Sequence, residues 1–350
     1  MAKVLMKGNE AIGEAAIRAG CRYYFGYPIT PQNELTAYMS KRMEEVGGVF
    51  IQAESELAAI NMVYGASAAG GRAMTSSSSP GISLKQEGIS YMVGAELPGV
   101  VVNICRGGPG LGNIAPSQSD YFQATRGGGH GDYYTIVLSP SSVQESADLV
   151  FLAFYLADKY RNPVIILGDG FLGQMLEPVE FKNPAFGRLP RKRWALTGAK
   201  ERPPNVIRSL YLKEGVLEKR NWELSKKYER MKKEVRYEGI YLDDAEFIVV
   251  AYGICARISK ASVLLLRAHG LKVGLIRPIT LWPFPSGVIK EVRDKIKRFF
   301  VIEMNLGQMV EDVKLAVEGR TSVSFYGRPG GGVPTPEEIY KVIKDGKGYF

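Results

Sequence analysis

Short runs of β-branched and apolar residues alternate along the chain with longer stretches in which apolar residues recur every three or four positions. The short runs predict strands at 48–52, 72–77, 99–105, 134–138 and 163–167. The longer stretches between them, such as 54–69 and 142–160, have the spacing of amphipathic helices. Strands that alternate with helices predict right-handed βαβ units and a parallel sheet, so the expected fold class is α/β.

This alternation stops near residue 182 and resumes near residue 241. The segment between is rich in Pro, Arg and Lys and ends in a long charged helical pattern, as in a linker or arm. Strand patterns then return at 246–253, 272–278, 298–304 and 322–327. We therefore expect a parallel-sheet domain over 1–182, a basic linker or arm over 183–240, and a smaller α/β domain over 241–350.

The net charge of +9 is concentrated in one part of the chain. Residues 182–236 contain 17 basic and 6 acidic residues, a net charge of +11, which leaves −2 for the remainder. The run 226–236 can contact phosphates, but its interspersed glutamates are also typical of a solvated helix face. We favour a solvated surface or a protein partner over nucleic acid, because no known nucleic-acid motif accompanies the charge.

Cysteine and histidine are scarce. The cysteines, Cys21, Cys105 and Cys255, are far apart and form no CxxC motif, and the chain has two histidines. This excludes a disulfide framework, a sequence-recognisable zinc site and an iron-sulfur cluster held by this chain alone. No segment is apolar for 18 residues, and the N-terminal stretch lacks a signal-peptide core, so we expect a soluble, cytoplasmic protein without membrane contact.

Two prolines bracket Ile29 and Thr30 in the stretch YFGYPITPQNE at 24–34. Proline disfavours the helical conformation for the residue before it, so Tyr27 and Thr30 are both expected to be extended. Pro31 suits the first position of a helix, and Thr30 suits its N-cap. The stretch is either a well-capped turn from strand to helix or a loop that presents the Thr30 hydroxyl to a ligand.

Two glutamates, Glu54 and Glu56, precede an apolar helical stretch. Two residues turn a helix by about 200°, so the two carboxylates cannot share a face, and Glu56 falls on the apolar stripe with Ile60 and Val63. A carboxylate at the end of a buried stripe is costly unless a partner binds it. The alternative is an ordinary acid at a helix N-terminus, stabilised by the helix dipole.

Polar residues also follow two other predicted strands, and ligands of parallel sheets gather at the carboxyl ends of strands. The run 76–79 consists of four serines and can cradle an anion, although helix capping is the simpler interpretation. Arg106 opens a glycine-rich loop, where a guanidinium suits a carboxylate ligand or an ordinary surface ion pair. No P-loop or well-formed GxGxxG follows a predicted strand, which gives no support for NAD or ATP.

The sequence GDG at 168–170 permits a negative test. Thiamine diphosphate enzymes hold Mg²⁺ and the diphosphate with GDG and an asparagine that follows at a characteristic spacing. Here 12 residues separate Gly170 from Asn183, and 34 separate it from Asn205. Neither spacing fits, so this chain is not expected to be a self-sufficient thiamine enzyme.

Five motifs occur in an order that resembles one enzyme family. They are GYPITP, QAESELAAINMVYGA, TSSSSPG, RGGPGLGNIAPSQSDYFQATRGGGHGDY and SSVQE. Together they resemble the α subunit of 2-oxoacid:ferredoxin oxidoreductases, and the segment from AYG to LIRPITLWPFP resembles the second domain of that family. The resemblance implies a pyrimidine-binding thiamine-diphosphate fold followed by a transketolase C-terminal-like domain. The glycine-rich loop is similar to that of the 2-oxoisovalerate (3-methyl-2-oxobutanoate) type, and the 2-oxoglutarate and pyruvate types are alternatives.

The resemblance implies roles for residues that match the family motifs. Glu56 matches the glutamate that hydrogen-bonds the aminopyrimidine ring of thiamine diphosphate. Thr30 matches the threonine beside the thiazolium and the oxoacid, and Arg106 matches the arginine that pairs with the oxoacid carboxylate. The neighbouring loop residues are expected to contact the cofactor; they are Tyr27, Pro28 and Ile29.

The resemblance also implies cofactors and partners. Diphosphate and Mg²⁺ are expected on a β subunit, and 4Fe-4S clusters on β and a ferredoxin-like δ subunit, with a separate γ subunit completing the complex. The implied reaction converts a 2-oxoacid and coenzyme A to acyl-CoA and CO₂ and reduces ferredoxin, and the chain is expected to be inactive alone. Two rival hypotheses are a basic nucleic-acid-binding protein and a structural subunit with a vestigial pocket.

Overall fold

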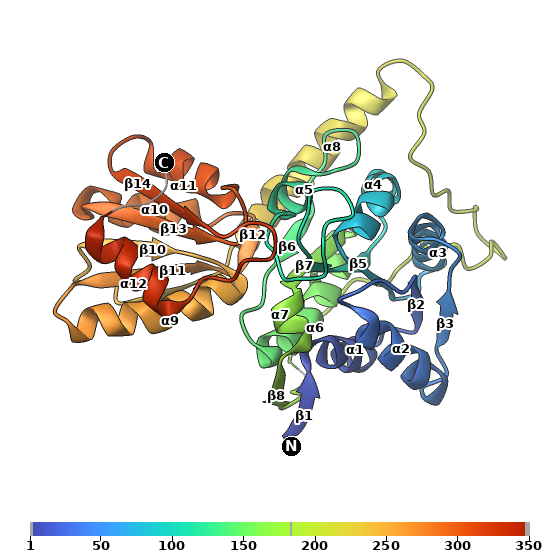
Figure 1. The fold of residues 1–350 in the computed structure, drawn as a ribbon. Coiled ribbons are helices and arrows are strands. Elements are labelled where there is room, and N and C mark those ends of the chain that lie inside the picture. Colours follow the sequence, from blue (N-terminus) through green and yellow to red (C-terminus); the bar gives the residue numbers. More distant parts are fainter. Residues whose placement is uncertain (1–2, 183, 347–350) are drawn as a thin grey trace.

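The computed structural model describes residues 3–182 and 184–346. Its larger sheet has seven strands and forms the N-terminal part of the molecule (Figure 1). In spatial order they are β12 (Thr280–Trp282), β6 (Ile136–Leu138), β7 (Pro163–Asp169), β5 (Gly99–Cys105), β4 (Ala73–Ser77), β2 (Tyr23–Gly26) and β3 (Val49–Gln52). All neighbours are parallel except β12, which pairs antiparallel with β6.

Helices cover both faces of this sheet, as right-handed crossovers in opposite directions require. One group packs together on one face and consists of α1 (Gly8–Arg18), α2 (Asn33–Glu45) and α6 (Val143–Tyr160). The other face carries α3 (Glu56–Ala68) and α4 (Ser79–Gly94), which pack against each other. Every residue of β5 and β7 is buried, as expected for central strands of a parallel sheet that is covered on both sides.

Short elements complete the N-terminal part. They are α5 (Tyr121–Arg126), α7 (Gly170–Gln174) and the antiparallel pair of β1 (Val4–Lys7) with β8 (Leu176–Val179). The strand β12 comes from the C-terminal half of the sequence and extends the first sheet at its β6 edge. The two halves of the chain are therefore connected through a shared sheet.

The second sheet has five strands. In spatial order they are β14 (Ser322–Gly327), β13 (Arg298–Glu303), β10 (Phe247–Val250), β11 (Val273–Pro278) and the antiparallel β9 (Tyr237–Ile240). Its helices are α9 (Gly253–Ala268), α10 (Ser286–Val292), α11 (Met309–Val317) and α12 (Pro336–Asp345). This smaller α/β unit lies beside the first sheet, and the C-terminal elements are red in Figure 1.

The basic segment is an extended loop followed by a helix. Residues 184–215 contain no helix or strand and run along the outside of the N-terminal part (Figure 1). The backbone NH of Leu196 in this segment donates to the carbonyl of Ala68. Helix α8 (Val216–Met231) follows, and its Arg220 pairs with Glu96. Part of the basic charge is therefore used within the chain.

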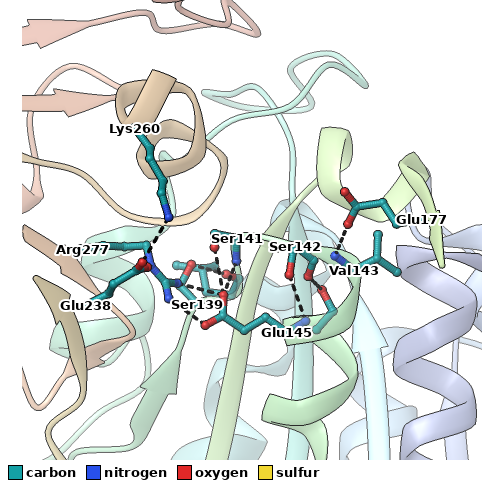
Figure 2. A network of polar contacts seen from close by, with 11 residues as sticks. Ser139, Ser141, Ser142, Val143, Glu145, Glu177, Glu238, Lys260 and Arg277 are labelled. Atoms are coloured by element: carbon teal, nitrogen blue, oxygen red, sulfur yellow. Dashed lines mark hydrogen bonds and ion pairs between the residues drawn. The ribbon is translucent and has the colours of Figure 1, made fainter. Parts of the chain in front are cut away.

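Arg277 at the end of β11 connects the second sheet to α6 (Figure 2). Its two Nη atoms donate to the carboxylate of Glu145 at 2.8 and 2.9 Å, and its Nε donates to Glu238 at 2.8 Å. Glu145 also accepts from the backbone NH and the hydroxyl of Ser141. Since Arg277 is 6% exposed, this network is a buried polar link between the two units.

In the part of the chain that the structure describes, no helix is long and apolar enough to cross a membrane.

Candidate functional site

The candidate residues lie in loops that leave one edge of the larger sheet. Strands β5, β4, β2 and β3 are adjacent and parallel, so their carboxyl ends share an edge. Arg106 follows β5, the serine run 76–79 leads from the end of β4 into α4, Thr30 follows β2, and Glu56 follows β3. This is the edge at which open α/β sheets bind ligands.

Glu56 is the first residue of α3 and is 6% exposed. Ser55 is the N-cap, and its hydroxyl accepts from the backbone NH of Ala58. Glu54 precedes the helix and is exposed. The prediction that the two side chains point to different environments is therefore confirmed. The reason differs from the predicted one, because Glu54 lies in the loop before the helix and not on another face of it.

The carboxylate of Glu56 lies against Gly81 in the first turn of α4. A Cβ atom on Gly81 would approach Oε1 of Glu56 to within 2.4 Å and Oγ of Ser77 to within 2.0 Å, so only glycine leaves room here. Among the described residues none donates a hydrogen bond to this carboxylate, and the buried Ser77 hydroxyl also has no partner. A buried hydroxyl without a partner, next to a carboxylate that accepts no hydrogen bond, fits a ligand that forms hydrogen bonds, such as the aminopyrimidine ring.

The loop 27–32 differs from the prediction at its end. Helix α2 begins at Asn33 with Gln32 as its N-cap, so the predicted N-cap at Thr30 is wrong. Thr30 and Pro31 lie in a turn before the helix, and the peptide bond between them is cis. The Thr30 side chain is half-buried, and its hydroxyl accepts a hydrogen bond from Nδ2 of Asn33 at 3.3 Å.

Gln32 is fully buried and fixes this loop to the sheet. Its Nε2 donates to the carbonyl of Tyr27 at 3.2 Å, and its Oε1 accepts from the hydroxyl of Ser76 at 2.6 Å. Tyr27 and Pro28 are exposed and Ile29 is half-buried. The backbone of the loop is therefore held firmly, while its side chains are accessible to a ligand.

Arg106 is buried, at 6% exposed, so the surface ion pair considered from the sequence is wrong. Its Nη1 donates to the carbonyl of Thr30 at 2.9 Å and its Nη2 to the carbonyl of Leu111 at 3.0 Å. Its Nε is buried without a hydrogen-bond partner. The structure thus brings Arg106 and the Thr30 loop together, and the guanidinium retains capacity for another acceptor.

The serine run does not cap α4 through its side chains, so that interpretation is wrong. Ser78 occupies the N-cap position but makes no side-chain cap bond, and its hydroxyl is buried without a partner. Ser79 donates instead to Oδ2 of Asp120 at 2.6 Å, and it accepts from the backbone NH of Arg106 at 3.0 Å. Ser79 consequently connects α4 to the loop that follows β5.

A cavity of about 430 Å³ lies beside Arg106, between this loop and the C-terminal unit. Its polar lining includes Ser79, Ser83, Arg106, Ser119, Asp120 and Gln308. The volume and the guanidinium suit a small anionic ligand.

Residues 14–237 match the family described as pyruvate flavodoxin/ferredoxin oxidoreductase, thiamine diP-bdg. Residues 245–339 match pyruvate:ferredoxin oxidoreductase core domain II. The chain belongs to the 2-oxoacid:ferredoxin oxidoreductase family. As a member of it, the chain is an oxidoreductase subunit, which confirms the resemblance seen in the motifs.

Sequence similarity to proteins of this family covers nearly the whole chain. The ketoisovalerate oxidoreductase subunit VorB of Methanothermobacter thermautotrophicus is 51% identical over 99% of this chain and 98% of its own length. The 2-oxoglutarate synthase subunit KorA of Methanocaldococcus jannaschii is 38% identical, over 97% of this chain and 98% of its own length.

Two solved structures are similar in fold. A 2-oxoglutarate:ferredoxin oxidoreductase from Magnetococcus marinus superimposes with a TM-score of 0.85 at 29% identity. The superposition covers 98% of the present chain and 65% of the Magnetococcus chain. A split gene transketolase superimposes with a TM-score of 0.60 at 13% identity, over 97% of each chain, and shows the fold alone. The expected thiamine-diphosphate-type and transketolase-like α/β architecture is therefore confirmed.

The GDG sequence of this oxidoreductase subunit has a structural use. Asp169 is the N-cap of α7, where its Oδ1 accepts from the backbone NH groups of Phe171 and Leu172. Burial raises the pKa of Asp169 to about 6. Over residues 3–182 and 184–346, no cluster of three or more His, Cys, Asp or Glu side chains could hold a metal ion. Asn183, considered in the spacing test, lies outside the described residues.

Sequence reasoning missed Lys85, which is fully buried beside Glu56. Its Nζ donates to the backbone carbonyl of Glu56 at 3.2 Å. Burial lowers the pKa of the Lys85 ammonium to about 7, and the Glu56 carboxylate opposes that shift. The available signal was a lysine at helical spacing between Ile82 and Ile89, on an apolar face.

Proposed function

We propose that this chain is the α subunit of a 2-oxoacid:ferredoxin oxidoreductase that acts on 3-methyl-2-oxobutanoate. The reaction breaks the bond between the carboxylate carbon and the 2-oxo carbon, releases CO₂, passes two electrons to ferredoxin, and joins the acyl group to the sulfur of coenzyme A. The substrate choice is supported by the higher identity to the ketoisovalerate relatives, 51% and 52%, than to the 2-oxoglutarate relatives, 36% to 38%.

One observation carries the assignment of the cofactor site. The buried carboxylate of Glu56 lies beside the unpartnered hydroxyl of Ser77, at the carboxyl edge of a sheet that belongs to a thiamine-diphosphate-binding family. We assign Glu56 to the aminopyrimidine ring, where its carboxylate accepts a hydrogen bond and holds a proton at Oε1 or Oε2. Tyr27, Pro28 and Ile29 are assigned to the same cofactor.

The oxoacid is assigned to Arg106 and Thr30. The free Nε of Arg106 can take one carboxylate oxygen of the substrate, and a charge-assisted bond of this kind fixes orientation. Thr30 is half-buried, and its carbonyl accepts a hydrogen bond from Arg106, so the two residues lie side by side. Thiamine diphosphate supplies the carbanion stabilisation when bound, and this chain supplies orientation and a proton-holding carboxylate.

The remaining cofactors are assigned to partner subunits. We place the diphosphate and Mg²⁺ on a β subunit, because Asp169 of the GDG sequence is already used to cap α7. The 4Fe-4S clusters are placed on β and δ, and a γ subunit completes a cytoplasmic complex that reduces ferredoxin. Within this chain we divide the sequence into a pyrimidine-binding domain at 1–182, an arm at 183–240 and a second domain at 241–350.

The test is to purify the chain with its partner subunits and to measure viologen or ferredoxin reduction with a panel of 2-oxoacids. We expect the highest kcat/KM with 3-methyl-2-oxobutanoate and no turnover by the single chain. A preference for 2-oxoglutarate or pyruvate would overturn the substrate assignment. Robust turnover by the single chain would overturn the division of the cofactor site between subunits.

A further inference from the structure

The face of α4 that meets α3 carries a lysine between two glycines. Gly81, Lys85 and Gly88 are four and three residues apart, so they share one face of the helix. A Cβ on Gly81 would lie 2.4 Å from Oε1 of Glu56, and a Cβ on Gly88 would lie 2.5 Å from Cγ2 of Ile60. The glycines therefore let α4 approach α3 closely, and Lys85 reaches the first turn of α3 from between them.

This place is unfavourable for an ammonium group. Lys85 is fully buried, and a buried lysine is costly unless it is paired. Its Nζ lies at the N-terminal end of α3, where the helix dipole is positive and repels a cation. Among the described residues, this amine donates one hydrogen bond, to the carbonyl of Glu56 at 3.2 Å. An apolar side chain would fill the same space at lower cost, so packing alone does not explain a lysine here.

The carboxylate of Glu56 compensates the charge of Lys85, because its negative charge attracts the ammonium and favours the charged form of the lysine. The same lysine thus holds the backbone carbonyl of Glu56 and balances the charge of its side chain. We propose that Lys85 is a positioning residue that fixes the first turn of α3 and so keeps the Glu56 carboxylate directed toward the bound aminopyrimidine ring. This inference rests on the proposed function of Glu56.

The test compares Lys85→Met with Glu56→Gln and with the double variant, all in the assembled complex. Methionine has a similar length and no charge, but it leaves the Glu56 carboxylate without its compensating charge, whereas the double variant removes both charges. We therefore expect the melting temperature measured without thiamine diphosphate to fall in Lys85→Met and to recover in part in the double variant. A purely structural lysine would lower the melting temperature equally in both variants.

The second readout is hydrogen–deuterium exchange at C2 of bound thiamine diphosphate. We expect Lys85→Met to slow exchange by about 10- to 100-fold, the range found for coupled neighbouring groups. Because Lys85 acts through Glu56, adding Lys85→Met to Glu56→Gln should slow exchange by no more than about 2-fold further. Lys227→Met is the matched control, since Lys227 is also buried but lies on α8 and pairs with Glu96. Exchange at C2 of thiamine diphosphate should be unchanged in this variant.

The outcomes separate the two claims. If Glu56→Gln slows exchange but Lys85→Met does not, the role of Lys85 is overturned and the proposed function stands. Fully multiplicative losses in the double variant, or a melting temperature that falls equally in Lys85→Met and in the double variant, would also overturn it in favour of a structural role. Normal exchange in Glu56→Gln would overturn the proposed function of Glu56 and, with it, the role of Lys85.

Discussion

Replacing Arg106 with methionine removes a buried charge from the wall of the cavity while it preserves most of the side-chain volume. In the structure the two Nη atoms donate to backbone carbonyls, and Nε is buried without a hydrogen-bond partner; we have proposed that the guanidinium binds the oxoacid carboxylate. A hydrogen bond to a charged group contributes about 1.5–3 kcal/mol, which corresponds to a loss of about 10- to 150-fold in kcat/KM for the preferred oxoacid.

The change also has a structural cost that must be measured separately. Arg106→Met leaves the carbonyls of Thr30 and Leu111 without their donors, at about 1 kcal/mol each. Both carbonyls belong to loops, so we expect the complex to assemble with a lower melting temperature. The conservative variant Arg106→Lys retains the charge and one donor group, so its kcat/KM should lie between those of the wild type and Arg106→Met.

The assay is viologen reduction. The oxoacid concentration is varied at saturating coenzyme A, and then the coenzyme A concentration is varied at saturating oxoacid. We expect the loss in the oxoacid kcat/KM and an unchanged KM for coenzyme A. Arg126→Met is the control, because Arg126 lies on α5 near the same loop but pairs with Asp312 at 2.7 Å and does not line the cavity. An unchanged oxoacid kcat/KM in Arg106→Met, or an equal loss in Arg126→Met, would refute the assignment.

Three further predictions concern other parts of the chain. Gly81→Ala places a methyl group 2.4 Å from the Glu56 carboxylate, so thiamine diphosphate binding measured by calorimetry should weaken and turnover should fall by about 10²-fold. Asp169 binds a proton more tightly in the folded state, with a pKa raised from 3.8 to about 6, so its contribution to stability is present below pH 3.8 and is lost as pH rises through about 6. Asp169→Asn keeps the cap acceptor and should remove this part of the pH dependence of thermal melts. Arg277→Met leaves Glu145 without its bidentate partner and should lower the free energy of unfolding in urea by about 1.5–3 kcal/mol, with partial recovery in the double variant with Glu145→Gln.

The central strands could be predicted from sequence because burial on both faces gives them continuous apolar runs. The run 99–105 predicts β5 with the bounds that the structure shows, and 163–167 predicts most of β7. The predicted runs 48–52 and 134–138 also contain the short strands β3 and β6, whereas β12 was not predicted. The three residues of β12 pair with β6, more than 140 positions earlier in the sequence, so no local pattern indicates their partner.

The candidate site was partly predictable. Glu56 could be singled out because it interrupts an apolar stripe, and its burial confirms the reason. The use of the Ser79 hydroxyl could not be predicted, because Asp120 reaches it from a loop 41 residues away. The targets of Arg106 were missed for the same reason, since one of them, the carbonyl of Thr30, is 76 residues away. Contacts between loops depend on the order of strands in the sheet, which local spacing does not determine.

The central claim is that the Glu56 carboxylate acts on the aminopyrimidine ring. The most direct measurement is hydrogen–deuterium exchange at C2 of thiamine diphosphate bound to the assembled complex, compared between wild type, Glu56→Gln and Glu54→Gln. Glutamine is nearly isosteric but cannot hold the proton, so exchange in Glu56→Gln should slow by about 10²- to 10⁴-fold. Glu54 is exposed and outside the helix, so Glu54→Gln should exchange at the wild-type rate. Wild-type exchange in Glu56→Gln, or equal slowing in both variants, would contradict the account.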